Sequence, residues 1–315
     1  MKNILNESIG NIFTPNKKCI INADIDGIIA GILLQNFLNW EVVGYSSCCG
    51  KPDDELWLYD DNENLNDCIF VDLPVSIKNF SVIDQHFISI NEEEVERYQS
   101  EGNKINPNVL RKRNFVNKDY TAKYPFGTAH FVLAVLENLG YIPEGYIIDF
   151  FKKINDFDLA DLVLRADRVI GNTNSYTPNC IDWAHWIESI GGVNTEVLFD
   201  VVIKEHQTRS VTEKNVEKTL LSFGCKGIDG DCSNLFRCKD YQRLFNYFSF
   251  LGSCLDMPPL PVFVVHEFGM LTGYRVYIDY NTDFELLQAD CNKDNVFSYA
   301  FVTMKALSMT LIDKK

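Results

Sequence analysis

The chain has 315 residues, enough for two ordinary domains, and 46% of them are hydrophobic, which is typical of a globular protein. Its formal net charge of −15 works against sequence-independent binding of long duplex DNA, because each phosphate contact needs a positive charge on the protein. No stretch approaches the about 18 apolar residues of a membrane span, and the N-terminus lacks the apolar core of a secretory signal, so we expect a cytoplasmic protein without a membrane segment.

The first part of the chain alternates between strand and helix patterns. Residues 18–24 and 41–46 predict buried strands, and residues 27–40 between them predict a helix that is apolar on most faces. Two further strands are predicted at 68–75 and 80–87. Strand–helix–strand order with continuously apolar strands favours a parallel sheet covered on both faces, so we expect an α/β fold.

The middle of the chain predicts mostly helices. Residues 91–108 are polar and predict a surface excursion. Helices are predicted at 126–141, 146–170 and 179–192, where apolar residues recur at helical spacing. The ten cysteines of the chain are scattered, which predicts free thiols rather than a disulfide framework.

The pattern of elements predicts two domains. A parallel-sheet domain is expected over residues 1–194, followed by a polar helical connector at 195–223. The remainder, 224–315, is expected to form a smaller α/β domain of the substrate-binding kind, with strands at 261–268 and 274–280.

Acidic residues follow three of the predicted strands. Asp24 and Asp26 come after the first strand, Asp72 ends the third, and Asp84 with His86 ends the fourth. Ligands bind at the carboxyl ends of the strands in an open parallel sheet, so these side chains are expected to converge. Carboxylates with an imidazole suit Mn²⁺ or Mg²⁺, and such ions would allow neighbouring acids to tolerate each other.

The order of these motifs resembles a known family. NADIDG, then VD after the third strand and DQH after the fourth, resembles the DHH phosphoesterase superfamily, with matching motifs over about residues 18–160. That superfamily includes RecJ-type exonucleases, oligoribonucleases, cyclic dinucleotide phosphodiesterases and family II inorganic pyrophosphatases. The resemblance implies a DHH-type N-terminal domain and hydrolysis of a phosphoester bond.

The resemblance also implies a role for each matching residue. It implies metal binding by four acids of the first, second and fourth motifs: Asp24, Asp26, Asp72 and Asp158, with Asp156 as the alternative to Asp158. Asp84 would orient the neighbouring ligands, and His86 would contact the phosphate or protonate the leaving group. Thr128 and His130 lie in a helix that follows the third motif in the family, so they are expected near the substrate.

Two positions depart from the family pattern. Asn22 stands where the first motif begins with histidine, and Gln85 replaces the middle histidine of DHH. Amide oxygens bind a hard cation more weakly than imidazole binds manganese, so the site would hold one ion, prefer magnesium, or lack catalysis. The glycine-rich substrate motif of the family is not recognisable. Its nearest counterparts lie at 266–275 and 224–232, where His266 and Arg275 are candidates for phosphate contacts and a core or surface role for each is the favoured alternative.

The sequence therefore predicts a metal-dependent hydrolase of a nucleotide, cyclic dinucleotide or short oligonucleotide. One alternative is a catalytically degenerate DHH-like subunit that binds nucleotides or joins an assembly; a homodimer or larger assembly is left open. The other is a haloacid dehalogenase-type phosphatase, which DIDGI resembles, with Asp24 as nucleophile and Asp26 as general acid. That reading gives Asp72 and the DQH motif no role.

Overall fold

The computed structural model describes ten stretches of the chain. They are residues 7–47, 54–89, 91–100, 103–113, 122–142, 178–191, 217–267, 271–277, 295–303 and 306–312.

Contacts within the chain divide it into two compact units. The helical unit combines residues 1–17, 23–42 and 125–264, and the sheet unit combines 18–22, 43–124 and 265–315. Neither unit is one continuous stretch, whereas the predicted domains are continuous ranges. The predicted boundaries stay a prediction, because most of the connector at 195–223 lies outside the described residues.

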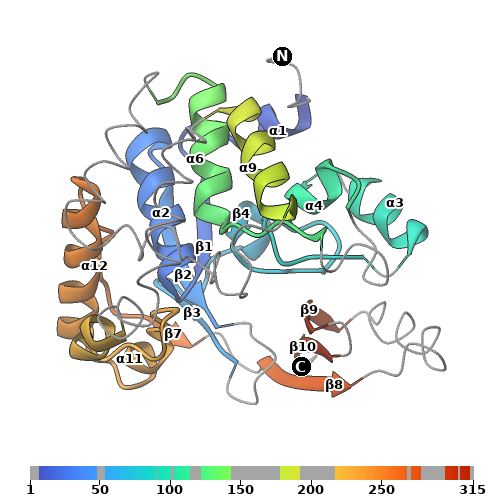
Figure 1. Ribbon diagram of the computed structural model, residues 1–315. Helices are drawn as coiled ribbons and strands as arrows, with labels where there is room; N and C mark the ends of the chain where they lie inside the picture. Colours follow the sequence, from blue (N-terminus) through green and yellow to red (C-terminus); the bar gives the residue numbers. More distant parts are fainter. Residues whose placement is uncertain are drawn as a thin grey trace. The chain divides into compact units, whose positions relative to one another are not determined.

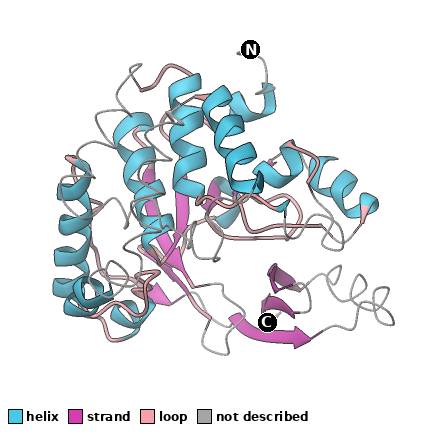
Figure 2. Ribbon diagram, viewed as in Figure 1, coloured by secondary structure: helices cyan, strands magenta, loops and turns pink. Residues whose placement is uncertain are grey.

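The sheet unit contains a central, mostly parallel sheet of seven strands in the order β6-β5-β4-β1-β2-β3-β7 (Figures 1 and 2). The strands are β1 (Lys18–Asn22), β2 (Glu41–Ser46), β3 (Leu56–Leu58), β4 (Cys68–Val71), β5 (Ser81–Ile83), β6 (Lys104–Ile105) and β7 (His266–Glu267). Parallel pairing joins β1 to β4, β4 to β5 and β5 to β6, while β3 pairs antiparallel with β2 and β7. The predicted α/β class and the four predicted N-terminal strands are confirmed, although β4 and β5 end before their aspartates.

A small antiparallel sheet completes this unit. Its strands, β8 (Leu271–Tyr277), β10 (Ala306–Ile312) and β9 (Val296–Thr303), lie in that order. Apolar side chains of the two sheets share a core within the unit, where Phe297 of β9 meets Phe70 of β4 with ring centroids 5.7 Å apart. The predicted strand at 274–280 is confirmed over 274–277, whereas 278–280 lie outside the described residues. Within the described part of 261–268, only the two residues of β7 form a strand.

The segment 91–108, which its polarity predicts to be a surface excursion, contains regular structure that extends to residue 110. It forms α3 (Glu92–Ser100), β6 and α4 (Pro107–Leu110). Earlier in the chain, the same unit contains a short 3₁₀ helix, η1 (Leu65–Asp67). The ring of Tyr98 is buried and stacks on Phe87 with centroids 4.4 Å apart. The prediction was wrong because this helix buries only a narrow apolar stripe beneath many charges.

The helical unit holds α1 (Glu7–Ile12), α2 (Ile25–Leu38), α6 (Thr128–Asn138), α9 (Pro178–Ile190), α11 (Ser233–Arg237) and α12 (Tyr241–Leu255). Helix α6 packs between α2 and α9, and α12 also contacts α2 (Figure 1). The helices predicted at 27–40, 126–141 and 179–192 are confirmed, whereas that at 146–170 lies outside the described residues. No helix in the described stretches is long and apolar enough to span a membrane.

Candidate metal centre

The centre of the large sheet contains a topological switch point. From β1 the chain continues into β2 on one side, and later returns to place β4 on the other side of β1. Such a point opens a space at the carboxyl ends of the two strands, where α/β proteins bind ligands. Asn22 is the last residue of β1 and Asp72 directly follows β4. The Nδ2 of Asn22 donates a hydrogen bond of 3.2 Å to Oδ2 of Asp72, so the two strand ends are joined there.

Asp72 has an unusual backbone. Its φ is 60°, in the left-handed region that aspartate tolerates better than most residues, and its N–H donates to the carbonyl of Ile83 at 2.8 Å. The residue is fully buried. The left-handed turn ends β4, so that the carboxylate lies beside the end of β1 instead of continuing the strand.

Asp84 is fixed by the backbone that follows it. One carboxylate oxygen, Oδ2, accepts the N–H groups of His86 at 2.8 Å and Phe87 at 2.9 Å. These bonds form a local turn of the kind that aspartate favours after a strand. The other oxygen, Oδ1, is left facing the imidazole of His86, with 2.7 Å to its Nδ1.

The imidazole of His86 lies between two carboxylates. Its Nδ1 is 2.7 Å from Oδ1 of Asp84 and 3.6 Å from Oδ1 of Asp72. An ionised carboxylate can only accept hydrogen bonds, so Nδ1 carries a proton and donates a hydrogen bond to Asp84. The other ring nitrogen, Nε2, is 2.9 Å from the Nε2 of Gln85, which fits a neutral ring accepting from the amide.

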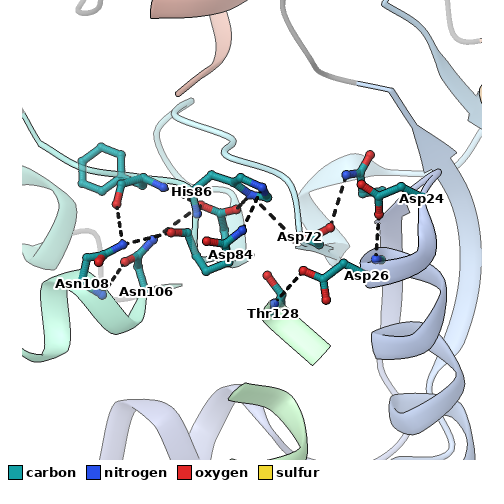
Figure 3. Close-up of polar contacts among 12 residues, drawn as sticks. Asp24, Asp26, Asp72, Asp84, His86, Asn106, Asn108 and Thr128 are labelled. Atoms are coloured by element: carbon teal, nitrogen blue, oxygen red, sulfur yellow. Dashed lines mark hydrogen bonds and ion pairs between the residues drawn. The ribbon is translucent and has the colours of Figure 1, made fainter. Parts of the chain in front are cut away.

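Asp72, Asp84 and His86 together form a group that could hold a metal ion (Figure 3). One ligand atom of each lies within 4.8 Å of the others. The aspartates are buried, and the His86 side chain is 22% exposed, so the group is open to solvent on the imidazole side. Two carboxylates and one imidazole suit Mn²⁺, or Mg²⁺ through the oxygens alone. The structure thus brings together three of the residues that the sequence singled out, with Asn22 and Gln85 bonded to them.

Two asparagines that the sequence analysis missed support this group (Figure 3). Asn106 caps α4 and places its Nδ2 at 3.5 Å from Oδ2 of Asp84. Asn108 donates to the carbonyl of Gln85 at 2.9 Å and accepts the N–H of Tyr124 at 2.7 Å. The sequence signal was Asn-Pro, an N-cap followed by proline at the first helical position, which predicts a helix start at α4.

Asp24 and Asp26 belong to the helical unit, where each bonds to a helix N-terminus (Figure 3). Asp24 is the N-cap of α2 and accepts the N–H of Gly27 at 3.0 Å. Asp26 is buried and accepts the N–H groups of Thr128 at 2.7 Å and Ala129 at 2.8 Å, at the start of α6. The positive end of each helix stabilises these carboxylates, which gives both acids a structural role. Metal binding by them stays a prediction.

Thr128 and His130 occupy the first turn of α6 and are both buried. Neither ring nitrogen of His130 has a hydrogen-bond partner among the described residues. Burial lowers the pKa of this histidine from 6.5 to about 4, so the ring is neutral at physiological pH. A substrate contact by either residue stays a prediction.

The remaining predicted residues are only partly described. His266 is an exposed residue of β7, paired with Leu58 across the sheet edge. Arg275 lies in β8 opposite Ser308 of β10, and its side chain lies outside the description. Asp156 and Asp158, the predicted fourth motif, fall outside the described residues.

Comparison of the chain with protein-family models, with curated proteins and with solved structures gave no match.

Proposed function

We propose that this protein is a metal-dependent phosphoesterase that hydrolyses a nucleotide, a cyclic dinucleotide or a short oligonucleotide. The observation that carries the proposal is the group of Asp72, Asp84 and His86 at the carboxyl ends of β4 and β5, next to the switch point of the sheet. The motif order that resembles the DHH superfamily supports the same chemistry.

The donor atoms of the group fit a divalent cation. Asp72 and Asp84 would hold it through carboxylate oxygens, and a bound Mn²⁺ or Mg²⁺ would supply charge to polarise a phosphoryl oxygen and activate a water molecule. Asn22 orients Asp72 through its amide. Asp84 holds the Nδ1 of His86, so a proton taken up by this ring resides on Nε2, the position from which it can be donated to a leaving oxygen.

A second candidate is a nucleotide-binding subunit without catalysis. It is favoured by the two amides that stand where the family has histidines. The Gln85 amide lies against Nε2 of His86, and the Asn22 amide lies against Oδ2 of Asp72, so both amides engage atoms that a metal or a phosphate would otherwise contact.

The test is hydrolysis of a chromogenic phosphodiester and of an RNA dinucleotide with Mn²⁺ or Mg²⁺. Asp72→Ala and His86→Ala are compared with Asp61→Ala, which removes an exposed acid of the same unit. Turnover that requires the metal, is lost in Asp72→Ala and His86→Ala, and is kept in Asp61→Ala supports the phosphoesterase proposal. Titration calorimetry with Mn²⁺ runs alongside. Nucleotide binding without turnover by the wild type selects the second candidate, and absence of turnover, metal binding and nucleotide binding refutes both.

A further inference from the structure

The loop between Cys225 and Cys232 is a small hairpin in the helical unit. Lys226 and Asp231 form an antiparallel bridge and exchange both backbone hydrogen bonds, of 2.8 and 3.1 Å. Residues 227–230 make the turn, and Gly227 and Gly230 have φ of 64° and 66°, which favours glycine at both positions.

The register of this hairpin makes Cys225 and Cys232 neighbours. A pair that exchanges both backbone bonds is followed by a pair that exchanges none, in which the two side chains lie closest on one face. Lys226 and Asp231 are the bonded pair, so the two cysteines form the next one. Their N–H groups point away from each other accordingly, that of Cys225 to the carbonyl of Leu220 and that of Cys232 to the carbonyl of Ala23.

Burial along the hairpin agrees with this register. Lys226 is exposed and Asp231 is partly exposed, whereas Cys225 and Cys232 are both buried on the opposite face. Both thiols are free in the structure. A pair of this kind has Cα atoms about 4.5 Å apart, within the range of about 4.4–6.8 Å that disulfides span.

We propose that Cys225 and Cys232 form a reversible disulfide that makes this hairpin a redox-sensitive clamp on the start of α2. This inference is independent of the proposed phosphoesterase activity.

The hairpin is bonded directly to the turn that begins α2. The N–H of Ile25 donates to the carbonyl of Asp229 at 3.0 Å, and the N–H of Cys232 donates to the carbonyl of Ala23 at 2.8 Å. The Cys232 thiol donates to the same carbonyl at 3.2 Å. A disulfide would remove this thiol donor while leaving the backbone bonds in place. By closing the hairpin covalently, it would keep the carbonyl of Asp229 and the amide of Cys232 in the positions from which they bond the turn that begins α2.

Oxidation needs a two-electron acceptor, and a small disulfide such as glutathione disulfide supplies it. One cysteine thiolate attacks glutathione disulfide, forms a mixed disulfide and releases one glutathione thiolate. The second cysteine attacks the protein sulfur of that mixed disulfide and releases the second glutathione. Two protein thiols are thereby oxidised, and one glutathione disulfide is reduced to two glutathione molecules.

Burial makes this exchange slow in the closed hairpin. It raises the pKa of Cys225 to about 12 and that of Cys232 well above its usual value, so the reactive thiolate is scarce until the hairpin opens. The test therefore uses two arms. Native protein is equilibrated for hours in glutathione buffers of increasing oxidised fraction, and reduced, unfolded protein is refolded in the same buffers.

Trypsin provides a specific readout, because Lys226 lies between the two cysteines. Cleavage there leaves Cys225 alone on peptide 219–226 and Cys232 alone on peptide 227–237. After alkylation of free thiols, we expect these peptides to be recovered as one cross-linked species, about 2 Da lighter than their sum. Dithiothreitol should separate them again.

Variants of single cysteines provide the controls. Cys225→Ser should abolish the cross-link, whereas Cys238→Ser, which removes an exposed cysteine nearby, should leave it unchanged. Tethering should also slow hydrogen exchange at the amide of Ile25. The proposal is overturned if both peptides stay separately alkylated in both arms, or if oxidation instead joins either cysteine to Cys238.

Discussion

The stability of the protein should fall in mild acid because of His130. Its imidazole is 4% exposed, and burial lowers its pKa to about 4, against 6.5 in the unfolded chain. As the pH falls from 6.5 toward 4, the unfolded chain takes up a proton that the folded protein does not. The contribution of the neutral ring is therefore complete above about pH 6.5 and is lost as the pH falls through this window.

The two pKa values set the size of the effect. At about 1.4 kcal/mol for each pKa unit, the interval corresponds to about 3 kcal/mol of unfolding free energy. His130→Leu removes the titrating group, so its unfolding free energy should lack this component. At pH 7 the variant should be as stable as the wild type or more so, because each buried polar atom without a partner costs about 1–3 kcal/mol.

Urea unfolding of wild type and His130→Leu at pH 7, 6, 5 and 4 measures this difference directly. The advantage of the variant should grow toward acid by about 3 kcal/mol. Val135→Ala is the matched control, since it changes a buried side chain of the same helix that does not titrate, so its difference from the wild type should not change over this pH range. Parallel pH profiles for wild type and His130→Leu would refute the reasoning.

Three further outcomes follow from the site. Asp26→Ala should lower the unfolding free energy by about 2–4 kcal/mol, because the backbone amides of Thr128 and Ala129 lose their acceptor. Chemical unfolding measures this change. Gly127→Ala should lower the unfolding free energy by about 1–3 kcal/mol, since a Cβ there would lie 2.7 Å from both carboxylate oxygens of Asp26. Gly10→Ala is the control: a Cβ there meets nothing within 4 Å, so this variant should not have a lower melting temperature. Gln85→His should raise the affinity for Mn²⁺ about tenfold in calorimetry, because it adds an imidazole beside the group, and an unchanged affinity would argue against a metal at the group of Asp72, Asp84 and His86.

The strand framework could be predicted from the sequence because its signals are local. A continuous apolar run predicts a buried strand, although the predicted ranges 68–75 and 80–87 extend beyond the ends of β4 and β5. The apolar runs placed Asp72 and Asp84 near the ends of neighbouring strands, and the structure confirms that they and His86 lie together. Residues 41–46 match β2 at both ends.

Other parts depend on contacts between distant residues and could not be predicted. The bonds from Asp26 to the start of α6 join residues 102 and 103 positions apart. The bond from Asn108 to the carbonyl of Gln85 crosses 23 positions, and no local pattern indicates which carbonyl the amide will reach. The bond from the Cys232 thiol to the carbonyl of Ala23 joins residues 209 positions apart, so no local pattern indicates it either.

The pairing of β7 with β3 has a consequence for how the chain folds. Trp57 and Leu58 of β3 pair with Glu267 and His266, so this edge cannot close until residues 266 and 267 have been synthesised. Until then the apolar strand Leu-Trp-Leu presents unpaired backbone groups along one side, which is a template for association with other chains. Pairing of strands so far apart in the sequence is also slow, because closing a long loop costs conformational entropy. The short, polar β7 thus covers the apolar edge of β3, and nascent or truncated chains that lack β7 should aggregate more readily than chains that contain it.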